Sequence, residues 1–163
     1  NIIPEACCEL NKKYKFVIIG DGGCRKNLED KIKLYNLRNI EVIEPVNRRK
    51  LIYYYLNADY LFLHLNDYKA FEKVLPSKIF EYGAMPKPII AGVNGYARKF
   101  ILNNLDNCYL FSPCNKNELI DLINNLPEHQ NAIQRNCFIK KYRRSKLNNS
   151  FSLSILENLS VLI

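Results

Sequence analysis

The sequence lacks the features that mark membrane-spanning and exported proteins. Its longest apolar stretches, such as residues 61–63, are interrupted by polar residues, whereas a membrane-spanning helix needs ~20 predominantly apolar residues. No charged segment followed by an apolar one opens the chain. We therefore expect no secretory signal and a cytoplasmic location.

The sequence also has few groups that could hold a metal ion. It contains two histidines, His64 and His129, and six cysteines, none of which forms a C-x-x-C pair. Structural zinc sites reuse such short ligand spacings, so we expect no metal site. Cysteines scattered through a chain without an export signal are expected to be reduced, buried thiols.

The composition is that of a folded protein with an excess of positive charge. Of the 163 residues, 48% are hydrophobic and 25% are charged, and the net charge is +8. A chain of this length buries roughly two thirds of the surface that it exposes when unfolded. The charge favours phosphorylated ligands, an anionic membrane surface or nucleic acid as a partner.

Much of the basic charge lies near the C-terminus, at Arg135, Lys140, Lys141, Arg143, Arg144 and Lys146. This cluster is expected to form either the solvated face of a helix or a contact with an anionic membrane surface. Nucleic acid is not expected as a partner, because no stacking aromatic motif or recognisable binding module accompanies the charge.

The order of the expected elements indicates an α/β fold. Strands are expected at residues 15–19, 40–43, 60–65, 88–91 and 108–111, and helices at residues 1–11, 25–35, 48–57, 76–85, 96–103 and 116–125. The strand at 15–19 is β-branched and is expected to be buried. Alternating strands and helices with short connections predict a Rossmann-like parallel sheet with helices on both faces.

No repeat or Pro/Gly-rich linker divides the chain, so residues 1–163 are expected to form a single domain. Residues 128–163 are expected to form a C-terminal helical tail with a break near Asn148 and Asn149. A doubly wound domain usually begins with a strand, whereas this sequence begins with a helix. We therefore expect the domain to be truncated at its N-terminus.

A short glycine-rich segment follows the first expected strand. Gly20, Asp21 and Gly22 precede a helix, where a phosphate can rest on free backbone N–H groups. However, Arg25 stands at the last position of the G-x-G-x-x-G pattern, which requires a small residue there. The segment therefore fits either a phosphate-binding loop or a turn that lets strand and helix pack closely.

A second candidate site lies on the expected helix at residues 76–85. Ser77, Lys78 and Glu81 are spaced to share one helical face near its N-terminus. That end faces the edge at which open α/β sheets bind ligands. A carboxylate can accept both ribose hydroxyls and a cation can bind phosphates, so the three residues suit a nucleoside diphosphate. A solvated salt bridge between Lys78 and Glu81 is the alternative.

Several segments together resemble a known enzyme family. They are the strand and loop at residues 16–22, the Asn-Ala-Asp at residues 57–59, and the stretch LPSKIFEYGA…KPIIAGVNGYA. They resemble the donor-binding domain of bacterial group 1 glycosyltransferases, the retaining, metal-independent enzymes of family 4. Those enzymes consist of two Rossmann-like domains, the GT-B fold. The similarity covers residues 11–125 and is closest to members that build O-antigen and capsule.

The resemblance implies roles for individual residues. The second glutamate of the family's E-x7-E motif corresponds to Glu81, which would hold the ribose. The first corresponds to Lys73, beside Glu72, so these two residues are the catalytic candidates, near the transferred sugar. The backbone N–H groups of Val74 and Leu75 would approach the β-phosphate.

The resemblance also implies a substrate and partners. Val46 lies in the loop that would bind the base of a nucleotide sugar, expected to be UDP-linked, and no metal cofactor is expected. The acceptor would be a glycan or lipid-linked sugar of a surface polysaccharide, at the inner face of the membrane. The acceptor domain and a phosphate-gripping Arg and Lys would precede Asn1. We therefore expect the chain alone to be inactive and to need an acceptor domain in cis or in trans.

Two other functions remain compatible with the sequence. One is a non-catalytic nucleotide-sugar-binding module. The other is a nucleotide-sugar epimerase of the same fold, which would need acid and base groups that the sequence does not obviously offer.

Overall fold

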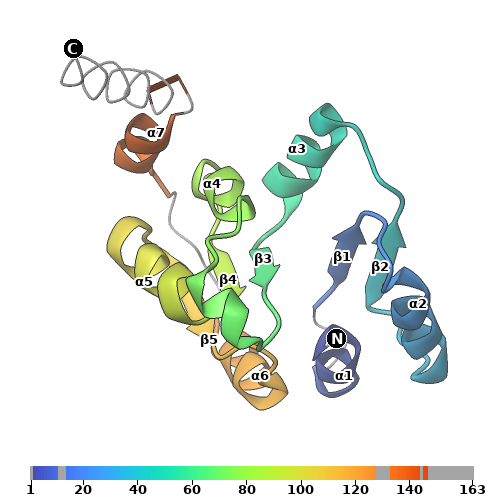
Figure 1. The fold of residues 1–163 in the computed structure, drawn as a ribbon. Helices are drawn as coiled ribbons and strands as arrows, with labels where there is room; N and C mark the ends of the chain where they lie inside the picture. The colour runs from blue at the N-terminus through green and yellow to red at the C-terminus, as the bar shows by residue number, and fades with distance from the viewer. Residues whose placement is uncertain (1, 11–13, 128–132, 144, 147–163) are drawn as a thin grey trace, which may run out of the picture.

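The computed structural model describes residues 2–10, 14–127, 133–143 and 145–146. Strands and helices alternate along the chain (Figure 1). The strands are β1 (Phe16–Ile19), β2 (Ile40–Ile43), β3 (Leu61–His64), β4 (Ile89–Gly92) and β5 (Cys108–Phe111). The helices are α1 (Ile2–Glu9), α2 (Arg25–Leu34), α3 (Arg48–Asn57), α4 (Lys78–Gly83), α5 (Gly95–Asn104), α6 (Lys116–Asn124) and α7 (Asn136–Tyr142). A 3-10 helix, η1 (Lys69–Lys73), lies between β3 and α4, where neither a strand nor a helix was expected.

The strands pair in parallel, which confirms the predicted α/β fold class. They form two sheets, whereas a single sheet was expected: β1 pairs with β2, and β4 lies between β3 and β5. The two sheets approach each other through the rings of Phe16 on β1 and Phe62 on β3, whose centroids are 6.5 Å apart. Side-chain packing, rather than a backbone ladder between described residues, therefore joins the two sheets.

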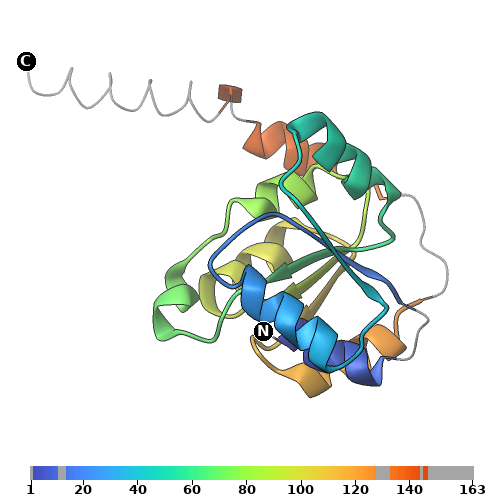
Figure 2. The ribbon, with the colours of Figure 1, turned by 90° about the vertical axis from the view of Figure 1, so that its right-hand side faces the viewer.

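Helices cover both faces of the three-stranded sheet, as predicted (Figures 1 and 2). Successive side chains of a strand point to opposite faces. Accordingly, Ile89 and Ala91 of β4 pack in a buried cluster with residues of α4, α5 and α7. Ile90 packs in a second cluster with residues of α1 and α6. All residues of β4 are buried, so this strand forms the centre of the core.

The two-stranded sheet is less buried than the sequence predicts. The expectation of a buried first strand is wrong, because every β1 side chain is at least partly exposed and Val17 is 43% exposed. Among the described residues, each of the two strands pairs only with the other, so neither has a neighbouring strand on both sides. An ion pair between Lys31 of α2 and Glu5 of α1, 2.8 Å long, connects this sheet's helix to the rest of the domain.

The basic C-terminal cluster divides into one buried residue and an exposed group. Arg135 is 6% exposed, so its expected place on a solvated or membrane-facing surface is wrong. It lies just before α7, which packs on α4 and α5 through the buried Phe138. Lys140, Lys141, Arg143 and Lys146 are exposed. Arg144, His129, and the second helix and break expected in the tail lie outside the described residues.

The cysteines are free thiols, but their expected burial holds only in part. Cys7 is buried and Cys108 is half-buried. Cys8, Cys24, Cys114 and Cys137 are exposed, on helices or turns whose inward-facing positions are taken by other residues. Burial raises the pKa of Cys7 to about 12, so this thiol is protonated at neutral pH.

Candidate functional site

The structure brings together two of the predicted site residues, on the surface of α4. The Nζ atom of Lys78 lies 3.7 Å from Oε2 of Glu81, and the two side chains are 46% and 38% exposed. Tyr55 of α3 bridges them. Its hydroxyl accepts a hydrogen bond of 2.8 Å from Lys78 Nζ and donates one of 3.3 Å to Glu81 Oε2. A cation and a carboxylate therefore face solvent together, joined by the hydroxyl of a buried tyrosine.

The aromatic rings of two tyrosines lie next to the Lys78 ammonium. The rings of Tyr55 and Tyr82 pack edge to face with their centroids 5.3 Å apart. Lys78 Nζ lies 5.6 Å from the first centroid and 5.9 Å from the second, within cation–π range of both. Burial raises the pKa of each tyrosine to about 12, so both hydroxyls keep their protons at neutral pH. Tyr55 is thus a hydrogen-bond donor to Glu81.

Sequence reasoning missed Tyr55, although a signal was present. Leu51 and Tyr55 of α3 both contribute to the same buried cluster, and they lie four residues apart. Such spacing marks the inward face of a helix. A tyrosine on an inward face needs a partner for its hydroxyl. Which partner it finds depends on α4, more than twenty residues away in sequence.

Ser77 does not join the group. It is exposed, its backbone is helical, and its side chain makes no capping hydrogen bond. A capping serine normally has an extended backbone, which lets its oxygen reach the N–H groups of the first turn. The helix begins at Lys78, two residues later than the sequence predicts.

The segment that contains Glu72, Lys73, Val74 and Leu75 is placed by α5. Gly95, at the start of α5, has a φ of +57°, and a Cβ there would overlap the backbone carbonyl of Glu72. The Val74 N–H already donates to the Phe71 carbonyl over 3.1 Å. Glu72 and Lys73 are exposed. No hydrogen bond or ion pair between described residues joins them to the pair on α4.

The loops after β1 and β2 are tied to each other. Gly20 N–H donates to the Ile43 carbonyl over 3.0 Å, and Gly22 N–H donates to Oδ1 of Asp21 over 2.8 Å. The Arg25 guanidinium donates to the Gly20 carbonyl over 3.1 Å and forms an ion pair of 2.7 Å with Glu44.

Arg25, which breaks the dinucleotide pattern, therefore orients both loops. Val46 follows Glu44 by two residues and is half-buried. No hydrogen bond or ion pair between described residues joins the loops after β1 and β2 to Lys78 or Glu81.

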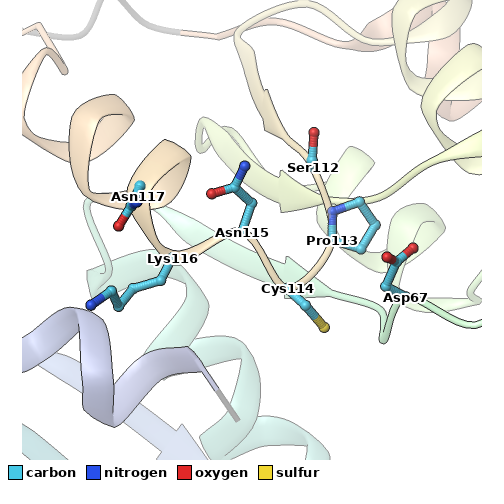
Figure 3. Close-up of a pocket in the computed structure, with 7 residues that line it drawn as sticks. All are labelled: Asp67, Ser112, Pro113, Cys114, Asn115, Lys116 and Asn117. Carbon is cyan, nitrogen blue, oxygen red and sulfur yellow. The ribbon is translucent and has the colours of Figure 1, made fainter.

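An open hollow lies beyond the ends of β3 and β5 (Figure 3). It is lined by Asp67, Ser112, Pro113, Cys114, Asn115, Lys116 and Asn117. His64 stabilises the border of this hollow, because its Nε2 atom accepts a hydrogen bond of 3.0 Å from the Cys114 N–H. A smaller neighbouring hollow is also bordered by Asp67 and Pro113 and includes Glu72. Glu72 is the one predicted site residue that lines either hollow.

Two further properties of the described residues bear on the chemistry. They contain no cluster of three or more His, Cys, Asp or Glu side chains that could hold a metal ion. Across the same part of the chain, the helices are too short or too polar to cross a membrane.

Comparison with known proteins identifies the family of this chain. No curated protein and no solved structure matches the chain. The model of the family described as "Glycosyl transferases group 1" matches residues 2–145. The match includes α4, the glycine-rich segment and every described strand. The chain therefore belongs to the group 1 glycosyl transferases.

Proposed function

We propose that this chain is the donor-binding domain of a retaining, family 4-type glycosyltransferase and binds a nucleoside-diphosphate sugar. The observation that carries the proposal is the pair formed by Lys78 and Glu81, 3.7 Å apart and open to solvent. A ribose diphosphate presents two hydroxyl donors and several anionic oxygens. A neighbouring carboxylate and ammonium match both kinds of group.

The two side chains take different parts of the ligand. Glu81 accepts hydrogen bonds from the ribose hydroxyls, and Lys78 binds the diphosphate. When the bond between sugar and phosphate breaks, negative charge develops on the diphosphate. A cation beside the diphosphate stabilises that charge more in the transition state than in the ground state, which accelerates the transfer.

The remaining candidates surround this pair in the proposal. Ser77 and the loop of Gly20, Asp21 and Gly22 lie near the diphosphate, and Val46 lies near the base. The Leu75 N–H contacts the β-phosphate, whereas the Val74 N–H must first leave the Phe71 carbonyl. Lys73 and Glu72 lie near the sugar. No metal takes part in these roles.

The acceptor in this proposal is a lipid-linked sugar of a surface polysaccharide such as O-antigen. An acceptor domain, in cis or in trans, holds it at the inner face of the membrane. The exposed Lys140, Lys141 and Arg143 support this location, because basic side chains are attracted to anionic lipids. UDP is the proposed nucleotide.

Calorimetry with UDP, followed by product analysis with UDP-sugars, tests the proposal. We expect UDP to bind with a dissociation constant weaker than micromolar. We expect no sugar transfer by residues 1–163 alone and transfer with retained anomeric configuration once an acceptor domain is added.

Each other outcome has a distinct meaning. Isomerised nucleotide sugar as the product indicates an epimerase. Binding without turnover, even with an acceptor domain, indicates a non-catalytic module. If neither UDP nor another nucleoside diphosphate binds, the proposal is wrong.

A further inference from the structure

We infer that Tyr55 is a positioning residue that couples the carboxylate of Glu81 to the ammonium of Lys78 when a nucleoside diphosphate binds. The inference rests on the proposed function for the identity of the ligand. The contacts that carry it lie within the protein, between α3 and α4.

Tyr55 is the fixed member of the group. It is 8% exposed, and its ring packs against Tyr82. Lys78 and Glu81 are much more exposed, and their direct contact is a surface ion pair of 3.7 Å. Such pairs hold long side chains weakly, because water screens the charges and both side chains lose rotamer freedom. The hydroxyl of the buried Tyr55 therefore supplies the orientation that the ion pair cannot.

The direction of the hydrogen bonds assigns each atom a task. Tyr55 donates to Glu81 Oε2, the oxygen that also faces Lys78. Glu81 Oε1 makes no hydrogen bond to a described residue, so it is the oxygen available to a ribose hydroxyl. When Lys78 turns toward a phosphate, Tyr55 still donates to Oε2 and keeps the carboxylate in place. Affinity rises because the carboxylate is oriented before the ligand arrives.

Tyr55→Phe removes the hydroxyl and keeps the ring that packs on Tyr82. We expect it to weaken UDP binding about three- to tenfold, the effect of losing one or two hydrogen bonds. Tyr53→Phe is the matched control, since Tyr53 lies on the same helix and is 63% exposed. It should bind UDP as the parent does. An affinity of Tyr55→Phe equal to that of the parent would overturn the inference.

A double-mutant cycle separates positioning from a general loss of structure. In a Glu81→Ala background, Tyr55→Phe should cost much less affinity than it does in the parent, because Tyr55 acts through the carboxylate. Costs that simply add would show that Tyr55 does not act through Glu81.

A measurement without nucleotide tests the contact between Tyr55 and Lys78 separately from the proposed function. Acetic anhydride acetylates lysine side chains through their neutral amine form and releases acetate, and mass spectrometry reports the rate at each lysine. In Tyr55→Phe, Lys78 should be labelled about twofold faster or more relative to Lys140, because its hydrogen bond to the hydroxyl is gone. An unchanged rate at Lys78 overturns the inference. If UDP fails to bind the parent, the proposed function is wrong, and the labelling rates still decide whether Tyr55 holds Lys78.

Discussion

The guanidinium of Arg135 donates a hydrogen bond of 2.7 Å to the backbone carbonyl of Asp106, just before β5. It also donates to the carbonyls of Met85 and Lys87, over 3.0 and 2.9 Å. One buried cation therefore joins three segments that are distant in sequence: the chain after α4, the turn before β5 and the start of α7. Because α4 carries Lys78 and Glu81, this anchor holds the helix that presents the candidate site.

Arg135→Met should lower the free energy of unfolding by about 2–4 kcal/mol, because it leaves several partly buried carbonyl groups without their donor. Urea unfolding measures the change. Lys140→Met, on the exposed side of α7, is the control and should change the free energy by less than about 0.5 kcal/mol. Equal effects of the two variants would show that the hydrogen bonds of Arg135 contribute nothing to stability.

Gly95→Ala should destabilise the protein by about 1–3 kcal/mol, because Gly95 has a positive φ and lies against the Glu72 carbonyl. Hydrogen exchange should also increase in η1, which rests on the start of α5. Thermal unfolding with hydrogen-exchange mass spectrometry measures both effects. Gly23→Ala is the control, since a Cβ at Gly23 has no neighbour within 4 Å. A Gly95→Ala variant as stable as the Gly23→Ala variant contradicts the placement of this segment.

Glu81→Gln should weaken UDP binding by about 1–3 kcal/mol, because the hydrogen bonds to the ribose lose the strength that a charged acceptor provides. The fold should survive, since Glu81 is 38% exposed. Calorimetry gives the affinity and circular dichroism checks the fold. Glu41→Gln, in a surface pair with Lys15 on the two-stranded sheet, serves as the control. If folded Glu81→Gln binds UDP as well as the parent does, the site assignment is wrong.

Stability should fall as the pH drops below about 6.5, because of His64. Burial lowers the pKa of His64 below its ordinary value of 6.5. The unfolded chain therefore takes up a proton at a higher pH than the folded protein does. The stabilisation is complete above 6.5 and is lost as the pH falls through the lowered pKa. Protonation also removes the acceptor for the Cys114 N–H.

Urea midpoints measured from about pH 7.5 to about pH 5 test this dependence. In His64→Gln, an amide oxygen can accept the same hydrogen bond without titrating, so the midpoint should fall less over this interval. Parallel curves for parent and variant would exclude His64 as the cause.

The order and type of the elements were predictable because they follow from local patterns. The strands at β2 and β5 and the helix α3 begin and end at the predicted residues. Apolar runs with short polar breaks specify strands, and helical spacing specifies helices, without knowledge of distant contacts. The predicted spacing also placed Lys78 and Glu81 on one face of α4, as observed.

Tertiary packing decided the features that depend on residues distant in sequence. From the sequence, Arg135 is predicted to be an exposed cation like its neighbours. A buried position becomes favourable only because several backbone carbonyl groups converge around its guanidinium. The β-branched run of β1 is typical of a buried strand, yet among the described strands β1 pairs with β2 alone, and Val17 is exposed. The sequence does not show which partner the hydroxyl of Tyr55 finds, and it meets Lys78 and Glu81 because its ring packs against Tyr82 of α4.

The sequence was therefore sufficient for the α/β class, the strand and helix order and the paired charges of α4, since each depends on residues a few positions apart. The division into two sheets, the buried Arg135 and the coupling through Tyr55 required the folded structure. Each of these depends on groups twenty or more residues apart, and a pattern of neighbouring residues carries no information about which of them meet.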